Sequence, residues 1–329
     1  MELQLKNIGM ITEANVKIDG LTVIAGENDT GKSTVGKALV STLYNYSKRE
    51  KLLNINEEEK VLSYQKNIFK KLMKFSFNQN SEIILDSNNV FIRYSNQHAK
   101  IEKKASFIRA IMIETPIIMN FYEFFSRLSI AQEEVEYDIT NYPYTFKFLY
   151  KRLSLPLKNI ENSICHNLIK DIIDGDFQIE KDNIVFKRND KKYDINAVAT
   201  GLKSFGILQL LSKNGYLKKD NILILDEPEV HLHPKWQLEM AKVIVELVQS
   251  DVKVLVTSHS PYMIEALKRY SDKEEQEEKT NFYLAEDGYI KQIEESNSKT
   301  LEKIFEKLSE PFDVFEEMDS QSLGNLING

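Results

Sequence analysis

Residues 26–33 read Gly26-Glu27-Asn28-Asp29-Thr30-Gly31-Lys32-Ser33 and fit the pattern G-x-x-x-x-G-K-[ST]. The apolar run Leu-Thr-Val-Ile-Ala at 21–25 precedes this segment, and residues 33–46 follow it with apolar side chains at helical spacing. Successive backbone N–H groups in such a loop, together with the positive end of the following helix, form a concave site for an anion. The order of strand, glycine-bounded loop and helix therefore predicts a phosphate-binding loop.

Two side chains of this loop suit a nucleoside triphosphate and its magnesium ion. We expect the Lys32 ammonium to reach the β- and γ-phosphates, and the Ser33 hydroxyl to join the Mg²⁺ shell. The remaining nucleotide contacts are predicted from Gly26, Asn28, Asp29, Thr30, Gly31 and Thr34. The loop thus predicts a nucleoside triphosphate with Mg²⁺ as the ligand.

A second motif ends another apolar run, Asn221-Ile-Leu-Ile-Leu-Asp226-Glu227. Four consecutive apolar residues indicate a central strand that is buried on both faces. The two carboxylates then fall at the carboxyl end of that strand, where ligands bind in open α/β sheets. We expect Asp226 to hold Mg²⁺ through its water shell and Glu227 to orient and deprotonate the attacking water.

A third apolar strand, 254–257, leads through Ser258 into His259. A histidine at this place can donate a hydrogen bond to the γ-phosphate and sense whether it is present. A lone histidine after a strand is more often a structural hydrogen-bonding residue. Its position one helix and one strand after Glu227 favours the functional role, so the predicted catalytic residues are Glu227, His259 and Lys32.

These three motifs together resemble those of the ATP-binding-cassette (ABC) ATPases, in particular the soluble SMC, RecF and OLD-type branch of AAA-family proteins. In that family a signature segment lies one helix before the Asp-Glu strand, and Ala-Thr-Gly-Leu-Lys-Ser at 199–204 occupies this place. The resemblance implies that Thr200, Gly201 and Lys203 contact the nucleotide of a second subunit, so that ATP joins a head-to-head homodimer. The usual segment is Leu-Ser-Gly-Gly-Gln. Here Leu202 replaces the second glycine and limits close backbone approach, and an ordinary helix start is the alternative.

The same resemblance bears on two neighbouring segments. Residues 228–234 match the D-loop region, whose His231 and His233 we interpret as loop-packing and dimer-contact residues because no third metal ligand is evident. Related ATPases carry a glutamine loop between their two lobes. The segment Glu114-Thr115-Pro116 is the best positional candidate here, although it lacks glutamine.

Alternating strands and helices after residue 200 predict a parallel sheet with right-handed crossovers. We expect an α/β fold, a P-loop NTPase of the ABC-ATPase head type. It should have a mostly parallel central sheet, an N-terminal antiparallel β part and an inserted helical lobe. The nucleotide-binding core is predicted at 1–46 and 196–310, the inserted helical and β lobe with the regulatory or partner surface at 47–195, and a loosely ordered tail at 311–329. The insertion is too short for the long coiled coil of SMC proteins. The segment after His259 lacks the Asp-x-Asp strand end of a Toprim domain.

Composition limits the other classes of function. The 329 residues include 43 Lys+Arg and 50 Asp+Glu, a formal charge of −7, which argues against indiscriminate coating of nucleic acid but is compatible with a local basic patch. The single cysteine, Cys165, permits no intramolecular disulfide. No apolar window approaches the roughly 18 residues of a membrane span, and the start lacks a signal-peptide pattern. We therefore expect a cytoplasmic protein with no membrane partner.

The sequence thus predicts an ATPase that converts ATP and water to ADP and phosphate. In the main hypothesis, a homodimer closes around ATP and signals through 47–195 to a separately encoded effector protein. The resemblance suggests bacterial anti-phage defence as the setting. The alternative is a RecF-like DNA-repair ATPase that clamps DNA on ATP binding, with the Lys-rich helix at 60–74 or the inserted lobe itself as the nucleic-acid contact. A transporter ATPase is disfavoured because the middle lobe is far larger than such subunits need.

Overall fold

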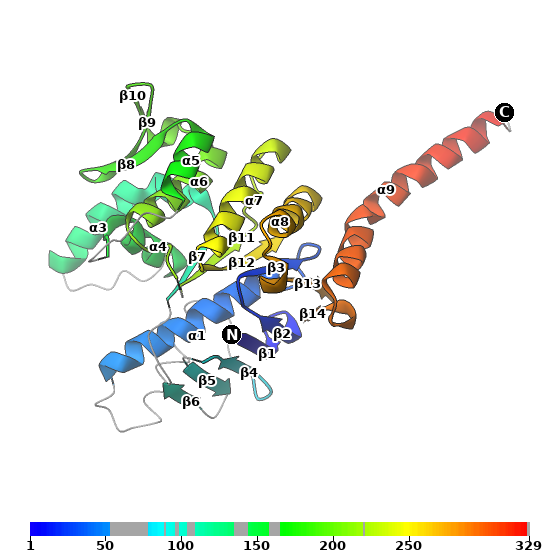
Figure 1. Cartoon of the computed structure of the whole chain (residues 1–329), viewed down its shortest axis with the longest axis horizontal. Coiled ribbons are helices and arrows are strands. Elements are labelled where there is room, and N and C mark those ends of the chain that lie inside the picture. Colours follow the sequence, from blue (N-terminus) through cyan, green and yellow to red (C-terminus); the bar gives the residue numbers. More distant parts are fainter. Residues whose placement is uncertain are drawn as a thin grey trace.

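The structure is a computed structural model, and it describes residues 1–52, 78–88, 90–95, 99–103, 109–134, 144–157, 165–219 and 221–327. The Lys-rich segment 60–74, which the DNA-clamp alternative invokes, lies outside the described residues. Within the described part of the chain, one eleven-stranded sheet forms the centre of the molecule, and a three-stranded sheet lies to one side (Figure 1).

The parallel part of the main sheet has the strand order β13-β3-β12-β11-β7. Their bounds are β3 (Leu21–Ala25), β7 (Ala110–Ile113), β11 (Ile222–Asp226), β12 (Lys253–Ser258) and β13 (Thr280–Glu286). The register pairs Ala25 with Ser258 and Asp226 with Thr257, so the carboxyl ends of these strands meet at one edge. The mostly parallel central sheet predicted from the apolar runs is therefore confirmed.

An antiparallel part, β6-β5-β4-β1-β2, continues the same sheet beyond β14. The bounds are β1 (Glu2–Ile8), β2 (Ile11–Lys17), β4 (Glu82–Asp86), β5 (Val90–Ser95), β6 (Ala99–Lys103) and β14 (Tyr289–Lys291). The short β14 links the two parts, because it pairs parallel with β2 and antiparallel with β13. This is the antiparallel N-terminal part that the sequence predicts.

Alternating side chains of the sheet build two hydrophobic cores, one on each face. Ile222 and Ile224 of β11 face the core under α1 (Lys32–Leu52), whereas Leu223 and Leu225 face the core under α6 (Thr200–Lys213), α7 (Pro234–Gln249) and α8 (Pro261–Lys273). Figure 1 shows α1 on one side of the sheet and α7 and α8 on the other. Strands covered on both faces explain the unbroken apolar run in β11.

The predicted insertion 47–195 contributes both to the main sheet and to a helical layer. Strands β4 to β7 all come from this segment. Apolar alternation gives β4 and β5 a buried face in the core that they share with β1, and β4 pairs with β1 directly. The helical layer comprises η1 (Pro116–Phe121), α3 (Tyr122–Glu134), α4 (Tyr144–Ser154) and α5 (His166–Ile173). The small sheet follows, with β8 (Asp176–Glu180), β9 (Asn183–Arg188), β10 (Lys191–Asp194) and η2 (Ile195–Ala197). Lys213 of α6 pairs with Asp176 at 2.8 Å, which joins this layer to the signature helix.

After η3 (Glu277–Lys279), β13, β14 and η4 (Ile293–Glu295), the chain ends in α9 (Asn297–Ile327), which projects away from the body (Figure 1). Its first turns are packed, with Leu301 and Ile304 buried. Phe312 and Phe315, in the predicted tail 311–329, lie on the continuing helix with exposed rings. No helix among the described residues has the length and apolarity needed to cross a membrane.

Candidate nucleotide-binding site

The predicted phosphate loop connects the end of β3 to the start of α1. Gly26 has φ +156°, and a Cβ there would lie 2.3 Å from the carbonyl oxygen of Ala285 in β13, so only glycine fits. Inside the loop, the Thr30 hydroxyl donates to the Glu27 carbonyl at 2.9 Å, and the Thr34 N–H donates to the Gly31 carbonyl at 3.0 Å. Asn28 and Asp29 lie on the exposed rim. The predicted loop residues therefore form one compact turn at the carboxyl edge of the sheet.

Lys32 is the first residue of α1, and its side chain is only 4% exposed. Its ammonium donates to the Glu27 carbonyl at 2.5 Å and lies 3.9 Å from Glu227 Oε1. Burial lowers the pKa of the Lys32 ammonium, and the nearby Glu227 carboxylate opposes that shift. The Lys32 ammonium is therefore held at the phosphate loop, where it can contact a bound anion.

Ser33 and Asp226, the two predicted Mg²⁺ residues, are in direct contact although they lie far apart in the sequence. The Ser33 hydroxyl donates to Asp226 Oδ1 at 2.8 Å, and the Thr257 hydroxyl donates to the same oxygen at 2.6 Å. Burial raises the pKa of Asp226, and these two hydrogen bonds oppose the rise. A hydroxyl and a carboxylate fit Mg²⁺, which takes hard oxygen ligands and usually keeps waters and substrate phosphates as the others.

Glu227 sits in a left-handed backbone conformation with φ +49°, which is uncommon for a residue with a side chain. Its N–H donates to the carbonyl and the hydroxyl of Thr257, both at 3.1 Å. Its Oε1 lies 3.3 Å from His259 Nδ1 and 3.9 Å from Lys32 Nζ. The three predicted catalytic residues therefore meet at one point.

Sequence reasoning missed two residues at this point, Thr257 and Glu229. Thr257 donates to the Asp226 carboxylate and accepts from the backbone N–H of Glu227, as described above. Glu229 is 4% exposed and accepts hydrogen bonds from Ser258 and from the His259 backbone. The signal for Glu229 is an acidic residue inside the segment 228–234, which the sequence assigns to loop packing and dimer contact through its two histidines.

The signature residues lie at the start of α6 and contact their own chain. A Cβ on Gly201 would lie 2.9 Å from the His231 carbonyl oxygen, so the helix start rests closely on the loop after β11. Thr200 is the first residue of α6 and is partly exposed. Lys203 is buried, and its ammonium donates to Asn120 of η1 at 2.9 Å. Within one chain, therefore, the Lys203 charge is directed to η1.

The candidate for the glutamine loop lies beside the second motif. Glu114 follows β7, pairs with Lys37 of α1 at 2.9 Å and accepts a hydrogen bond from the Thr145 hydroxyl of α4. A cavity of about 250 Å³ is lined by Glu114 and Thr115 together with Asp226 and Glu227. This position thus links the helix after the phosphate loop to the helical layer.

His233 caps α7, because its Nδ1 accepts from the Lys235 N–H at 3.3 Å. This contact agrees with the interpretation of the histidine pair as loop-packing residues. Among the described residues, no group of three His, Cys, Asp or Glu side chains could hold a metal ion.

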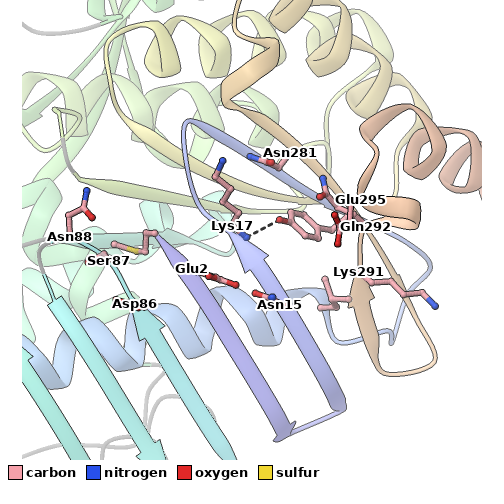
Figure 2. A pocket seen from close by; sticks show the side chains of 13 residues that line it. Glu2, Asn15, Lys17, Asp86, Ser87, Asn88, Asn281, Lys291, Gln292 and Glu295 are labelled. Atoms are coloured by element: carbon pink, nitrogen blue, oxygen red, sulfur yellow. Dashed lines mark hydrogen bonds between the residues drawn. The ribbon is translucent and has the colours of Figure 1, made fainter.

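A larger cavity of about 930 Å³ lies at the opposite end of the sheet (Figure 2). It is lined by polar residues of β2 and β13, among them Lys17 and Asn281. The Lys17 N–H donates to the Tyr283 hydroxyl at 2.8 Å, shown as the dashed line in Figure 2. Asn281 pairs with Thr22 near the beginning of β3, so this cavity is remote from the phosphate loop at the other end of that strand.

Comparison with known proteins bears on the whole site. A family described as "AAA domain, putative AbiEii toxin, Type IV TA system" matches residues 21–265, which include all three motifs. The chain is 34% identical over 47 residues to the Septu protein PtuA of Bacillus thuringiensis, a match that covers 14% of this chain and 12% of that protein.

Two solved structures match this chain over most of its length at low TM-scores. An SMC head bound to the C-winged helix domain of ScpA has a TM-score of 0.49 at 15% identity, covering 88% of this chain and 95% of that one. The ADP conformation of MJ1267, an ATP-binding cassette of an ABC transporter, has a TM-score of 0.41 at 14% identity, covering 97% and 99%.

Proposed function

We propose that this chain is an ATP-hydrolysing switch that dimerises around ATP and signals to a partner. The chain belongs to the AAA domain family described above, and so to a family of ATPases. The observation that carries the proposal is the meeting of Lys32, Ser33, Asp226, Glu227 and His259 at the carboxyl edge of the sheet. These groups supply the positive charge, the oxygen ligands and the base that phosphoryl transfer to water requires.

In the proposed reaction, the attacking water gives a proton to the Glu227 carboxylate as its oxygen bonds to the γ-phosphorus. The bond from that phosphorus to the β–γ bridging oxygen breaks, and ADP and phosphate result. Lys32 stabilises charge on the transferring group, and His259 donates a hydrogen bond to it. Mg²⁺, held through Ser33 and Asp226, would neutralise charge on the phosphates.

The dimer in this proposal places the α6 start of one chain against the nucleotide of another. The N–H groups of Thr200 and Gly201 are at the positive end of a helix, which suits an anion. The Ala199 cap makes no side-chain hydrogen bond to the first turn. We do not include Lys203 in this contact because its ammonium is engaged by Asn120.

The signalling part of the proposal concerns the partner. The family description names an AbiEii toxin and a Type IV TA system, and a segment of 47 residues is similar to a Septu protein of Bacillus thuringiensis. We therefore propose a separately encoded effector protein as the partner, in bacterial anti-phage defence. The DNA-clamp alternative assigns the nucleic-acid contact to residues 60–74, which lie outside the described residues, or to the inserted lobe itself. The family match favours the switch, which is the function we put forward.

The test is to purify the chain and its Glu227→Gln variant, and to measure phosphate release and molar mass with ATP and Mg²⁺. We expect the unaltered chain to hydrolyse ATP. The variant should lose activity by about 100-fold or more, the usual contribution of a general base, and accumulate as an ATP-bound dimer. Brisk turnover by the variant would refute the role of Glu227, and a strictly monomeric variant at saturating ATP would refute the dimer. Stimulation by short duplex DNA that fades with added salt would favour the clamp instead.

A further inference from the structure

A buried carboxylate that the proposed reaction does not use lies directly behind His259. Glu229 Oε1 accepts a hydrogen bond from the Ser258 hydroxyl at 2.7 Å and another from the His259 backbone N–H at 2.9 Å. Its second oxygen, Oε2, is buried and has no hydrogen-bond partner within the described residues. A buried carboxylate that is only half satisfied is costly to keep for packing alone. This arrangement therefore points to a use for the charge.

Two carboxylates, those of Glu227 and Glu229, lie beside the same ring nitrogen of His259. Its Nδ1 is buried, lies 3.5 Å from Glu229 Oε1 and 3.3 Å from Glu227 Oε1, and makes no hydrogen bond within the described residues, whereas the side chain as a whole is 40% exposed. Acceptors beside Nδ1 favour the form of the ring that carries a proton there. The other ring nitrogen, Nε2, is then the one that can face a ligand, and it donates to a phosphate oxygen only when it carries a proton as well.

A second set of hydrogen bonds joins this arrangement to the loop under α6. The Ser260 N–H donates to Ser258 Oγ at 3.1 Å, and the Ser260 hydroxyl donates to Gln237 Oε1 at 2.6 Å. Gln237 Nε2 in turn donates to the Leu232 carbonyl at 3.1 Å. These hydrogen bonds connect both ends of the segment 229–232 to the end of β12. Within that segment, the His231 carbonyl lies close to Gly201 at the start of α6.

We propose that Glu229 is a positioning residue for His259: it holds the ring with Nδ1 inward and Nε2 toward the γ-phosphate position, and it couples that ring to the loop on which α6 begins. This inference rests on the proposed function, in which His259 contacts the γ-phosphate. It goes further by assigning the orientation of the ring to a residue that does not itself touch the nucleotide.

A double-mutant cycle of Glu229→Ala and His259→Ala tests the proposal. We expect Glu229→Ala alone to lower kcat about tenfold or more while the KM for ATP changes less than about threefold, because the phosphate loop is untouched. In the His259→Ala background, the same substitution should change kcat less than about twofold, since the residue acts through the ring. Glu246→Ala, an exposed glutamate of α7, is the matched control and should keep wild-type activity. Additive losses in the double variant would overturn the proposal.

Two further measurements cover the other outcomes. If Glu229→Ala does not fold, Glu229→Gln replaces it in the cycle, because Gln keeps the volume and removes the charge. It should lose activity only when His259 is present, and a fully active Gln variant would then overturn the proposal.

If the unaltered chain releases no phosphate, the proposed function fails separately. Side-chain ¹H–¹⁵N spectra of ¹⁵N-histidine protein still test the ring: we expect a single Nδ1-protonated His259 that loses this uniformity in the Glu229 variant. An unchanged His259 signal would overturn the proposal.

Discussion

Substitution of Gly201 by alanine tests whether the signature helix is fitted to its own chain as well as to a partner's nucleotide. The added Cβ would lie 2.9 Å from the backbone oxygen of His231 and 3.0 Å from Leu232 Cδ2. The His231 oxygen belongs to the backbone of a residue with φ +67°, so it cannot move as a flexible side chain would. The contact must therefore be relieved by a shift of α6 or of the loop.

The expected size of the effect follows from two opposing contributions. Overpacking of this kind typically costs about 1–3 kcal/mol. Alanine in a helix is more stable than glycine by up to about 1 kcal/mol, and the gain is smaller in the first turn. The free energy of unfolding of the nucleotide-free protein should thus fall by about 1 kcal/mol, which for a chain of this size lowers Tm by about 2 °C.

The assay is thermal unfolding without nucleotide, with Ser204→Ala on the same helix as the control for helix propensity. The control should show no loss of Tm. ATP-dependent dimerisation of Gly201→Ala should also weaken, because the shifted helix start no longer presents its N–H groups correctly. If Gly201→Ala were more stable than the unaltered chain, as helix propensity alone requires, the close contact with His231 would be refuted.

Three further predictions concern the nucleotide. Lys32→Ala should weaken ATP binding by about 10- to 100-fold or more, because it removes a buried charge from the loop, and wild-type affinity in equilibrium binding would exclude that role. Asp226→Asn should abolish Mg²⁺-dependent hydrolysis yet leave the Tm of the nucleotide-free protein equal or higher. Burial raises the pKa of Asp226, so folding disfavours its ionised form relative to its protonated form, and the neutral amide avoids that cost; a clear drop in Tm would contradict this reasoning. Thr200→Arg should bind ATP as a monomer but fail to dimerise, which molar-mass measurements with ATP would show; an unchanged dimer fraction would count against the trans contact.

Local sequence was sufficient to predict the phosphate loop, the strand that ends in Asp226 and Glu227, and the strand that ends before His259. Each is a short apolar strand followed directly by its polar residues, and parallel strands place their carboxyl ends at one edge of a sheet. Sequence spacing alone therefore predicted that these residues would meet. The family match over 21–265 is consistent with that prediction.

Only the tertiary structure could decide which groups hold these residues in place. The Glu229 contact with His259, the Thr257 contact with Asp226 and the close approach of Gly201 to His231 each join positions about 30 residues apart. Such contacts depend on the register of neighbouring strands and on how loops turn, which no local pattern encodes. The same reason explains why strands from the predicted insertion join the main sheet, since an edge strand is chosen by the partner that can bury its apolar face.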